Sequence, residues 1–217
     1  MGWKTACIIT GDCQPGYLGT LPPHQPDRAR ELAAKLGYKN FEPGESCKMD
    51  DYPESSAFVI GAYDQAVFLA DRDIIYKCFD DRNQDFFRAA LTFYPQGSLL
   101  LVTAISTVNY FGYAYYEKGK LIREFAGSAD DGVTSEIGEP LPEEESIFKD
   151  SEVRDGERLF KCEYEGEVSY EPADGVGEAL AWQVMGRYFG APYLSADSHL
   201  ELQMERFKKK RKFLFFG

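Results

Sequence analysis

The sequence predicts an α+β fold, a single domain in which helices pack on a mixed or mostly antiparallel sheet. Three observations favour this class. Hydrophobic residues make up 44% of the 217 residues and aromatic residues 15%, which is enough for one sizeable core. Residues 97–128 contain successive strand patterns with no helical pattern between them, as in an antiparallel meander. Helical patterns stand on both sides of this region, at residues 26–36 and 176–190.

The chain begins with a strand and a helix. Residues 4–10 are a short apolar run, which predicts a buried strand. Apolar residues recur at helical spacing through residues 26–36, and Gly37 follows them where a helix commonly ends. Residues 40–54 are dense in turn-forming residues, so we expect an irregular connection there.

Two further strands and a second helix are expected before the meander. Residues 57–63 and 66–70 are apolar runs around a short turn, which predicts two strands. Residues 73–79 fit either a third strand or a helical turn, and periodicity does not decide between them. Residues 83–95 predict a helix that ends at Pro95.

The meander itself gives the clearest signal in the chain. Residues 98–106 are almost continuously apolar, which predicts a central strand buried on both faces. Residues 110–128 alternate apolar and polar positions around Gly119, which predicts a β-hairpin with Gly119 in the turn. Strand alternation leaves Tyr113 and Tyr115 half-exposed, where they either pack across strands or form part of an interface.

The remainder of the chain is expected to cover and extend the sheet. Residues 129–160 predict a long excursion over the surface, to which residues 160–166 could add a short strand. Residues 176–190 predict a helix with a wide apolar stripe. We therefore expect one α+β domain over residues 1–194, followed by a C-terminal helix and basic tail over residues 195–217.

The charge of the chain is negative and unevenly spread. The net charge is −12, but residues 130–178, the acidic segment, contain 17 acidic and four basic residues, a local net charge of about −13. Residues 206–212, the basic run, carry six positive charges in seven positions. The acidic body should repel nucleic acid and anionic membranes and attract basic proteins. The basic run could be a frayed tail, an intramolecular clamp on the acidic segment, a contact for a membrane surface or nucleic acid, or a tail that docks on a partner.

Composition also bears on compartment and cofactor chemistry. No window approaches 18 uninterrupted apolar residues, so no transmembrane segment is expected, and the N-terminus resembles a first strand more than a signal peptide. The five cysteines are odd in number, irregularly spaced and never paired as C-x-x-C, which favours a reduced, cytoplasmic protein. With only two histidines, no metal centre built on histidine is expected, and no cofactor is predicted.

The order of several short motifs resembles that of an uncharacterised bacterial protein family of unknown function. The family pattern combines a Gly-x-Lys-Thr strand, a V-x-x-F-x-Y-A hairpin, an IGE-x-LP segment and a GEAL helix. The matching residues are Gly2, Lys4, Thr5, Val108, Phe111, Tyr113, Ala114, Gly119, Asp131, Gly132, Ile137, Gly138, Glu139, Leu141, Pro142, Gly177, Glu178, Ala179 and Leu180. The resemblance implies one bacterial domain and carries no catalytic residue.

The loop after the first strand, residues 11–19, has the glycines of a phosphate-binding loop but lacks its other parts. Tyr17 and Leu18 stand where a P-loop has Lys and Ser or Thr, so we expect a shaped turn and not a phosphate site. Cys13 in this loop is a candidate nucleophile, with His24 as the only nearby base. The alternative for this pair is a structural thiol and a surface histidine.

A second group of candidate residues consists of carboxylates. Asp12, together with Asp71 and Asp73, could line a small-molecule or metal-dependent enzyme site near the first-strand loop. Asp80 and Asp81 add to the acids around the second helix. A chain with 36 acidic residues produces such groupings by abundance alone, and no recognisable catalytic set is present.

These observations favour a non-enzymatic acidic binding protein that engages a basic protein partner, in the manner of an immunity or antitoxin protein. The alternative is the small-molecule or metal-dependent enzyme. The sequence does not predict the oligomeric state. The candidate interface residues are Asp130, Asp131, Glu136, Glu143, Glu144, Glu145, Tyr113 and Tyr115.

Overall fold

The computed structural model describes residues 2–74, 84–193, 195 and 197–210. Its described strands form a nine-stranded sheet and a separate three-stranded sheet. The strands are β1 (Lys4–Gly11), β2 (Phe41–Lys48), β3 (Ala57–Ala62), β4 (Ala66–Ala70), β5 (Ser98–Ile105), β6 (Tyr110–Glu117), β7 (Lys120–Ser128), β8 (Gly132–Ile137), β9 (Glu152–Arg154), β10 (Glu157–Tyr164), β11 (Glu167–Glu171) and β12 (Gln203–Lys209). The α-helices are α1 (Pro26–Lys35), α3 (Gln84–Leu91), α4 (Glu145–Phe148) and α5 (Ala173–Phe189), and short 3-10 helices lie at Tyr17–Thr20, Ser106–Val108 and Asp197–Glu201. The predicted α+β class is therefore confirmed.

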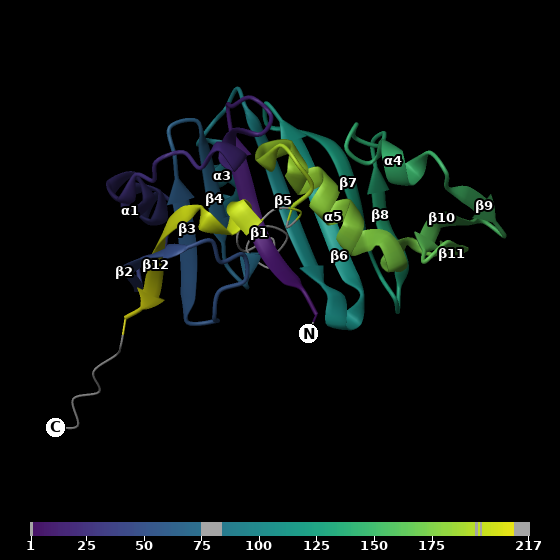
Figure 1. The fold of residues 1–217 in the computed structure, drawn as a ribbon. Helices are drawn as coiled ribbons and strands as arrows, with labels where there is room; N and C mark the ends of the chain where they lie inside the picture. The colour runs from purple at the N-terminus through teal and green to yellow at the C-terminus, as the bar shows by residue number, and fades with distance from the viewer. Residues whose placement is uncertain (1, 75–83, 194, 196, 211–217) are drawn as a thin grey trace.

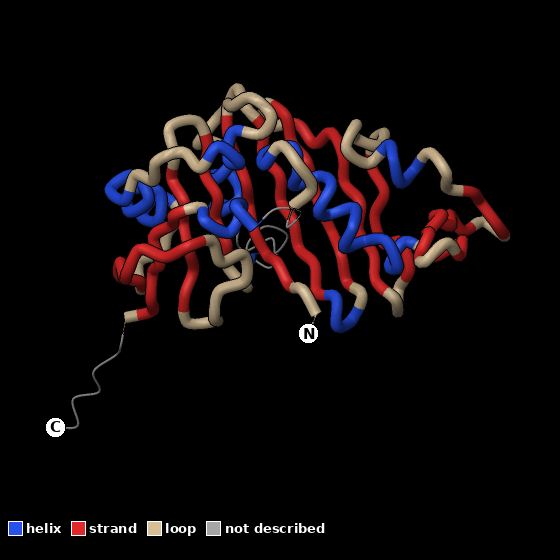
Figure 2. The backbone as a smooth tube through the Cα atoms, in the orientation of Figure 1, coloured by secondary structure: helices blue, strands red, loops and turns tan. Residues whose placement is uncertain are grey.

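The large sheet is antiparallel throughout, in the order β2-β12-β3-β4-β1-β5-β6-β7-β8. β1 occupies the centre, with Cys7 opposite both Ala70 of β4 and Val102 of β5. Two hairpin systems, β3-β4 and β5 to β8, therefore stand on either side of the first strand. The three-stranded sheet β9 to β11 projects beyond β8 at one end of the molecule (Figure 2).

Helices cover both faces of the central strands. α5 runs across one face over β5 and β6, where Leu180 and Val184 pack into a core with Val102 and Tyr113 (Figure 1). α1 and α3 pack on the opposite face, where Leu32 belongs to the second core. This three-layer arrangement buries both faces of β1, as its continuous apolar sequence predicts.

Most of the predicted elements are confirmed. The structure contains the first strand, the helix from Pro26, the β3-β4 hairpin, the helix before Pro95, the buried β5 and the helix that ends before Gly190. The hairpin β6-β7 turns through Lys118 and Gly119, which both have positive φ, as a two-residue hairpin turn requires. Residues 75–79 of the ambiguous segment lie outside the described residues, as do Asp80 and Asp81.

Three sequence expectations are wrong. Residues 41–48 form the edge strand β2, whose Pro43 and exposed polar residues are tolerated because an edge strand is paired on one side. In place of the helix expected after residue 195, the described residues form a short 3-10 helix at Asp197–Glu201, and Gln203–Lys209 then forms β12 between β2 and β3. The surface excursion contains more than one strand, since β8 joins the large sheet and β9 to β11 form the small one.

Candidate functional site

An open groove lies at the β8 end of the molecule, where the acidic segment leaves the large sheet. It encloses about 1170 Å³ between the end of β8, the loop that follows, α4 and β10. Its charged and aromatic lining residues are Glu136, Glu139, Glu145, Phe148, Lys149 and Arg158. We call it the acidic groove, because it holds three carboxylates against two cations and lies within the acidic segment.

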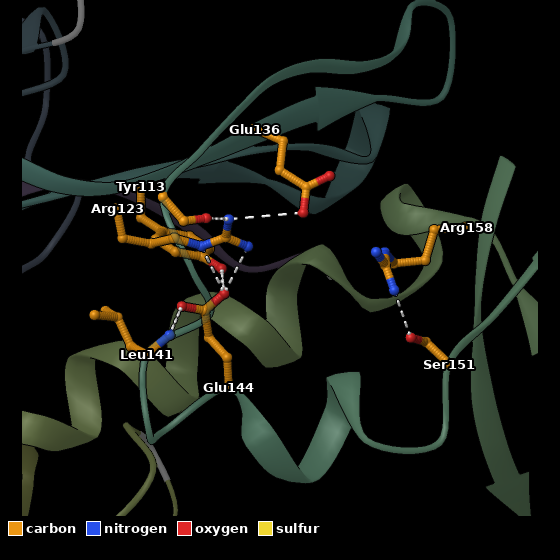
Figure 3. A network of polar contacts seen from close by, with 8 residues as sticks. Tyr113, Arg123, Glu136, Leu141, Glu144, Ser151 and Arg158 are labelled. Carbon is orange, nitrogen blue, oxygen red and sulfur yellow. Dashed lines mark hydrogen bonds and ion pairs between the residues drawn. The ribbon is translucent and has the colours of Figure 1, made fainter. Parts of the chain in front are cut away.

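The floor of the groove is held by a buried ion pair between Arg123 of β7 and Glu144 (Figure 3). Nε and Nη2 of Arg123 donate to Glu144 Oε1 at 3.1 and 3.0 Å, and the Tyr113 hydroxyl donates to the same oxygen at 2.5 Å. The backbone N–H of Leu141 donates to Oε2 at 2.7 Å, and Arg123 Nη1 donates to the carbonyl of Gly138 at 2.9 Å. Each charged group of the pair therefore has several partners, as burial requires.

Aromatic rings complete this floor. The Arg123 guanidinium lies 5.0 Å from the ring centre of Phe125 and 5.2 Å from that of Phe148, so Phe148 lies between the buried cation and the groove. Burial, and then the neighbouring Glu144 carboxylate, raise the pKa of Tyr113 well above its ordinary value. Tyr113 therefore stays protonated and donates its hydrogen bond, and the loop 138–145 is fixed to the sheet.

The structure places the predicted interface residues in four different settings. Asp130 and Asp131 are exposed in the β7-β8 turn, whereas Glu136 and Glu145 are exposed at the groove beyond the other end of β8. Glu143 is half-buried and pairs with Arg187 of α5 at 2.9 Å.

The other three predicted interface residues are not on the surface. Tyr113 and Tyr115 are buried beneath α5, and Glu144 is buried in the ion pair. The expectation of half-exposed tyrosines is therefore wrong, because the sequence of a hairpin does not show which of its faces a helix covers.

Arg123 is a residue that sequence reasoning missed, although a signal was present. It stands between Ile122 and Glu124 at a position that points to the same side as the buried Phe125. A charged residue at an inward position of an otherwise apolar strand face predicts a buried partner. Its partner Glu144 is only one of three consecutive glutamates, so the sequence does not single it out.

A second, smaller cavity of about 190 Å³ lies beside the first-strand loop, and we call it the first-strand cavity. Ser98 Oγ and the Tyr188 hydroxyl are 2.7 Å apart in its wall. Arg187 donates to the Tyr115 hydroxyl at 3.3 Å, while its Nε is buried and has no partner among the described residues. Burial lowers the pKa of Arg187, but Tyr115 and Glu143 outweigh it and raise the pKa above its ordinary value.

The glycines of the first-strand loop serve close packing. Gly16 has φ +82°, and its Cα lies against Gly190 at the end of α5. A Cβ on Gly19 would stand 2.1 Å from the carbonyl oxygen of Phe189. The loop is thus a shaped turn that packs against the C-terminus of α5, as the sequence predicts.

The candidate nucleophile and base are not brought together. Cys13 lines the first-strand cavity, and burial followed by the charge of Asp12 raises the pKa of its thiol to about 11. His24 instead lies against β3, with Nδ1 3.2 Å from the N–H of Ala62, and burial lowers its pKa. No hydrogen bond between the Cys13 thiol and His24 is found in the described part of the chain.

The candidate carboxylates are also separated. β4 runs antiparallel to β1, so Asp71 follows the strand end beside Ala6, whereas Asp12 follows the other end of β1. Asp71 is buried and accepts a hydrogen bond from the Tyr38 hydroxyl at 2.6 Å and another from the Asp73 N–H at 2.9 Å. The expectation of one site built from Asp12, Asp71 and Asp73 is therefore wrong.

Two further findings concern metals and membranes. Across residues 2–74, 84–193, 195 and 197–210, no three His, Cys, Asp or Glu side chains gather closely enough to hold a metal ion. No helix in the same part of the chain combines the length and apolarity needed to cross a membrane.

Comparison with known proteins places the chain in a family without adding a function. A search of curated proteins gives no match, and a search of solved structures gives none. A family model matches residues 4–206, which excludes most of the basic run. The match confirms that the chain is a member of an uncharacterised family, whereas the bacterial origin and the specific motifs stay predictions. The chain belongs to a family of unknown function, DUF6928.

Proposed function

We propose that the protein is a non-enzymatic binding protein whose acidic groove engages a basic protein partner. The observation that carries this proposal is an open groove of about 1170 Å³ set in the part of the chain with a net charge of about −13. Protein surfaces of opposite charge attract each other before contact, which accelerates association and selects among partners. The same charge disfavours nucleic acid as the ligand.

The exposed carboxylates of the groove are available to such a partner. Glu139 and Glu145 are exposed, and neither makes an ion pair or side-chain hydrogen bond with a described residue. A partner's Lys or Arg would therefore meet carboxylates without first breaking an internal pair. The buried Arg123–Glu144 ion pair already fixes the loop that bears Glu139. This loop therefore loses little conformational entropy when a partner binds.

The small sheet extends this surface with apolar contacts. Val153, Tyr164 and Val168 are exposed on β9 to β11, between glutamates such as Glu163 and Glu167. Exposed aromatic and apolar residues within a polar rim are typical of protein interfaces. An immunity or antitoxin role, in which an acidic surface occludes a basic toxin, is one form of this function.

Capture from the native host with three immobilised proteins tests the proposal. The wild type is compared with Glu139→Lys/Glu145→Lys and with a matched control, Glu31→Lys/Glu54→Lys, which reverses two exposed acids away from the groove. We expect the wild type and the control to capture a basic protein that the groove variant does not capture. In the wild type, this protein should cross-link to residues of the groove. Equal capture by all three proteins would refute the proposal.

The first-strand cavity supports a second candidate function, the binding of a small carboxylate-bearing molecule. The observation that favours it is the buried Arg187 Nε, which lacks a partner among the described residues. Thermal-shift measurements with acetate, succinate and glutamate test it, with Arg187→Met as the variant and Arg158→Met as the control. A saturable rise in Tm that only Arg187→Met abolishes supports the site, and no rise with any probe excludes it.

A further inference from the structure

We propose that the acidic groove of one molecule accepts the basic run of a second copy, so that the protein associates head to tail. This inference rests on the proposed function, because it uses the same groove and names its partner. It is drawn from the positions of the two charged regions in the fold.

The cations of the basic run lie at the opposite end of the large sheet from the groove. Lys208 and Lys209 are exposed at the end of β12, next to the edge strand β2. Lys210 is exposed as well, and its Nζ donates to the carbonyl of Lys39 at 3.4 Å, which adds another exposed lysine to this corner. Arg211 and Lys212 follow in the sequence.

This placement rules out the intramolecular clamp that the sequence suggested. β12 is second and β8 is ninth in the sheet, so seven inter-strand spacings separate them, roughly 34 Å at about 4.8 Å each. Lys212 lies two residues beyond Lys210, which adds only about 7 Å of extended chain. The described lysines of the basic run therefore cannot contact the groove of their own molecule, since β12 and α4 lie at opposite ends of the molecule (Figure 1). They are free to contact the groove of another copy.

The groove would meet the basic run through its side chains. Lys208 is paired through its backbone with Glu42 of β2 and Ala57 of β3, and Lys209 with Phe41 of β2, so the described part of the basic run stays within the sheet of its own molecule. The side chains of these two lysines lie at exposed positions. Their ammonium groups would pair with the exposed carboxylates of the other copy's groove, such as Glu139 and Glu145.

Ionic strength should affect this association in two opposing ways. Two copies each carry a net charge of −12 and repel one another at long range. At about 0.15 M salt the screening length is about 8 Å, so distant repulsion fades while contacts between the groove and the basic run persist.

Because the two surfaces are different patches, the contact is heterologous and extends into open chains unless it closes into a ring.

A charge swap followed by sedimentation velocity tests the inference on the full chain. The groove variant is Glu139→Lys/Glu145→Lys, and the basic-run variant is Lys209→Glu/Lys210→Glu/Lys212→Glu. At 0.15 M salt and with reductant present, the average mass of the wild type should rise above 24.5 kDa between about 10 µM and 1 mM, as expected for weak association. Each variant alone should remain at the monomer mass, and an equimolar mixture of the two should regain the wild-type behaviour.

The same samples distinguish this inference from the proposed function. Anisotropy of a fluorescent octalysine peptide reports whether the groove binds basic chains at all. Peptide binding by a wild type that stays monomeric at 1 mM overturns head-to-tail association and leaves the proposed function standing. A lack of both peptide binding and self-association overturns both proposals, and self-association that survives either charge reversal overturns the head-to-tail arrangement.

Discussion

Replacing Asp51 with asparagine should remove a pH dependence from the stability of the protein. Asp51 follows β2, and its carboxylate accepts a hydrogen bond from Trp3 Nε1 at 3.1 Å. Burial raises the pKa of this carboxyl from 3.8 to about 6, against the opposing effect of the Trp3 hydrogen bond. The folded protein therefore binds a proton at Asp51 more tightly than the unfolded chain does.

The sign and size of the effect follow from proton linkage. A raised pKa in the folded state means that the stabilising contribution is complete below pH 3.8 and is lost as the pH rises through about 6. The whole shift corresponds to about 3 kcal/mol, of which roughly 1.4 kcal/mol develops between pH 5 and pH 8. Asparagine cannot ionise, so the stability of Asp51→Asn lacks this pH-dependent contribution.

Urea unfolding, followed by tryptophan fluorescence, measures the difference between wild type and Asp51→Asn at pH 5 and pH 8. We expect the variant to gain about 1.4 kcal/mol relative to wild type over this interval, whatever the fixed cost of the substitution. Glu31→Gln, at an exposed position of α1, controls for the loss of one charge. A difference between wild type and Asp51→Asn that is equal at both pH values would show that burial does not shift this carboxyl.

Three further substitutions or reactions test the packing and the chemistry of the site. Glu144→Ala leaves Arg123 buried without its partner and should lower the free energy of unfolding in urea by about 3–5 kcal/mol. The double variant Arg123→Met/Glu144→Leu should cost less, because it leaves no buried charge. The opposite order would contradict the buried ion pair. Gly177→Ala should destabilise the protein by about 1–3 kcal/mol despite the better helix propensity of alanine, because a Cβ would stand 2.3 Å from the Phe111 ring. A stabilised variant would disprove the close approach of α5 to Phe111. Cys13, with its pKa of about 11, should react with iodoacetamide at pH 7.5 roughly 100-fold more slowly than an exposed cysteine. Mass spectrometry measures the two rates, and equal rates would contradict the burial of Cys13.

Local sequence patterns predict the elements whose partners are close in the chain. The β6-β7 hairpin and α5 follow from alternation, helical spacing and their glycines, because each is decided by residues within one element or one turn. The strand β12 is instead determined by residues that lie far away in the chain. Met204 packs in the core under α5 and Phe207 in the core under α1, and the spacing between them imitates a helical stripe. Its pairing with β2 and β3, more than 140 residues away, leaves no local signal.

The candidate site was predictable in its charge and not in its geometry. The acidic segment is visible in composition, and four of the eight predicted interface residues are exposed carboxylates. Which glutamate is buried depends on Arg123, which lies 21 positions earlier and meets Glu144 only after β8 has turned the chain back. The expected Asp12 and Asp71 site failed for a similar reason, because β1 and β4 are antiparallel neighbours in the sheet and the residues that follow them lie at opposite ends of it.

The strand order also decides what the charges of this chain can do. In the sequence, the basic run follows the acidic segment after fewer than 30 residues, a distance that an extended chain could span to neutralise it internally. The fold uses that interval for α5 and for the return to the far edge, where β12 inserts between β2 and β3. Opposite charges therefore end at opposite ends of a rigid sheet, where they cannot neutralise each other within one molecule. An acidic groove kept apart from its own cations remains open to a basic partner, and a basic strand end kept apart from its own acids remains open to the groove of another copy.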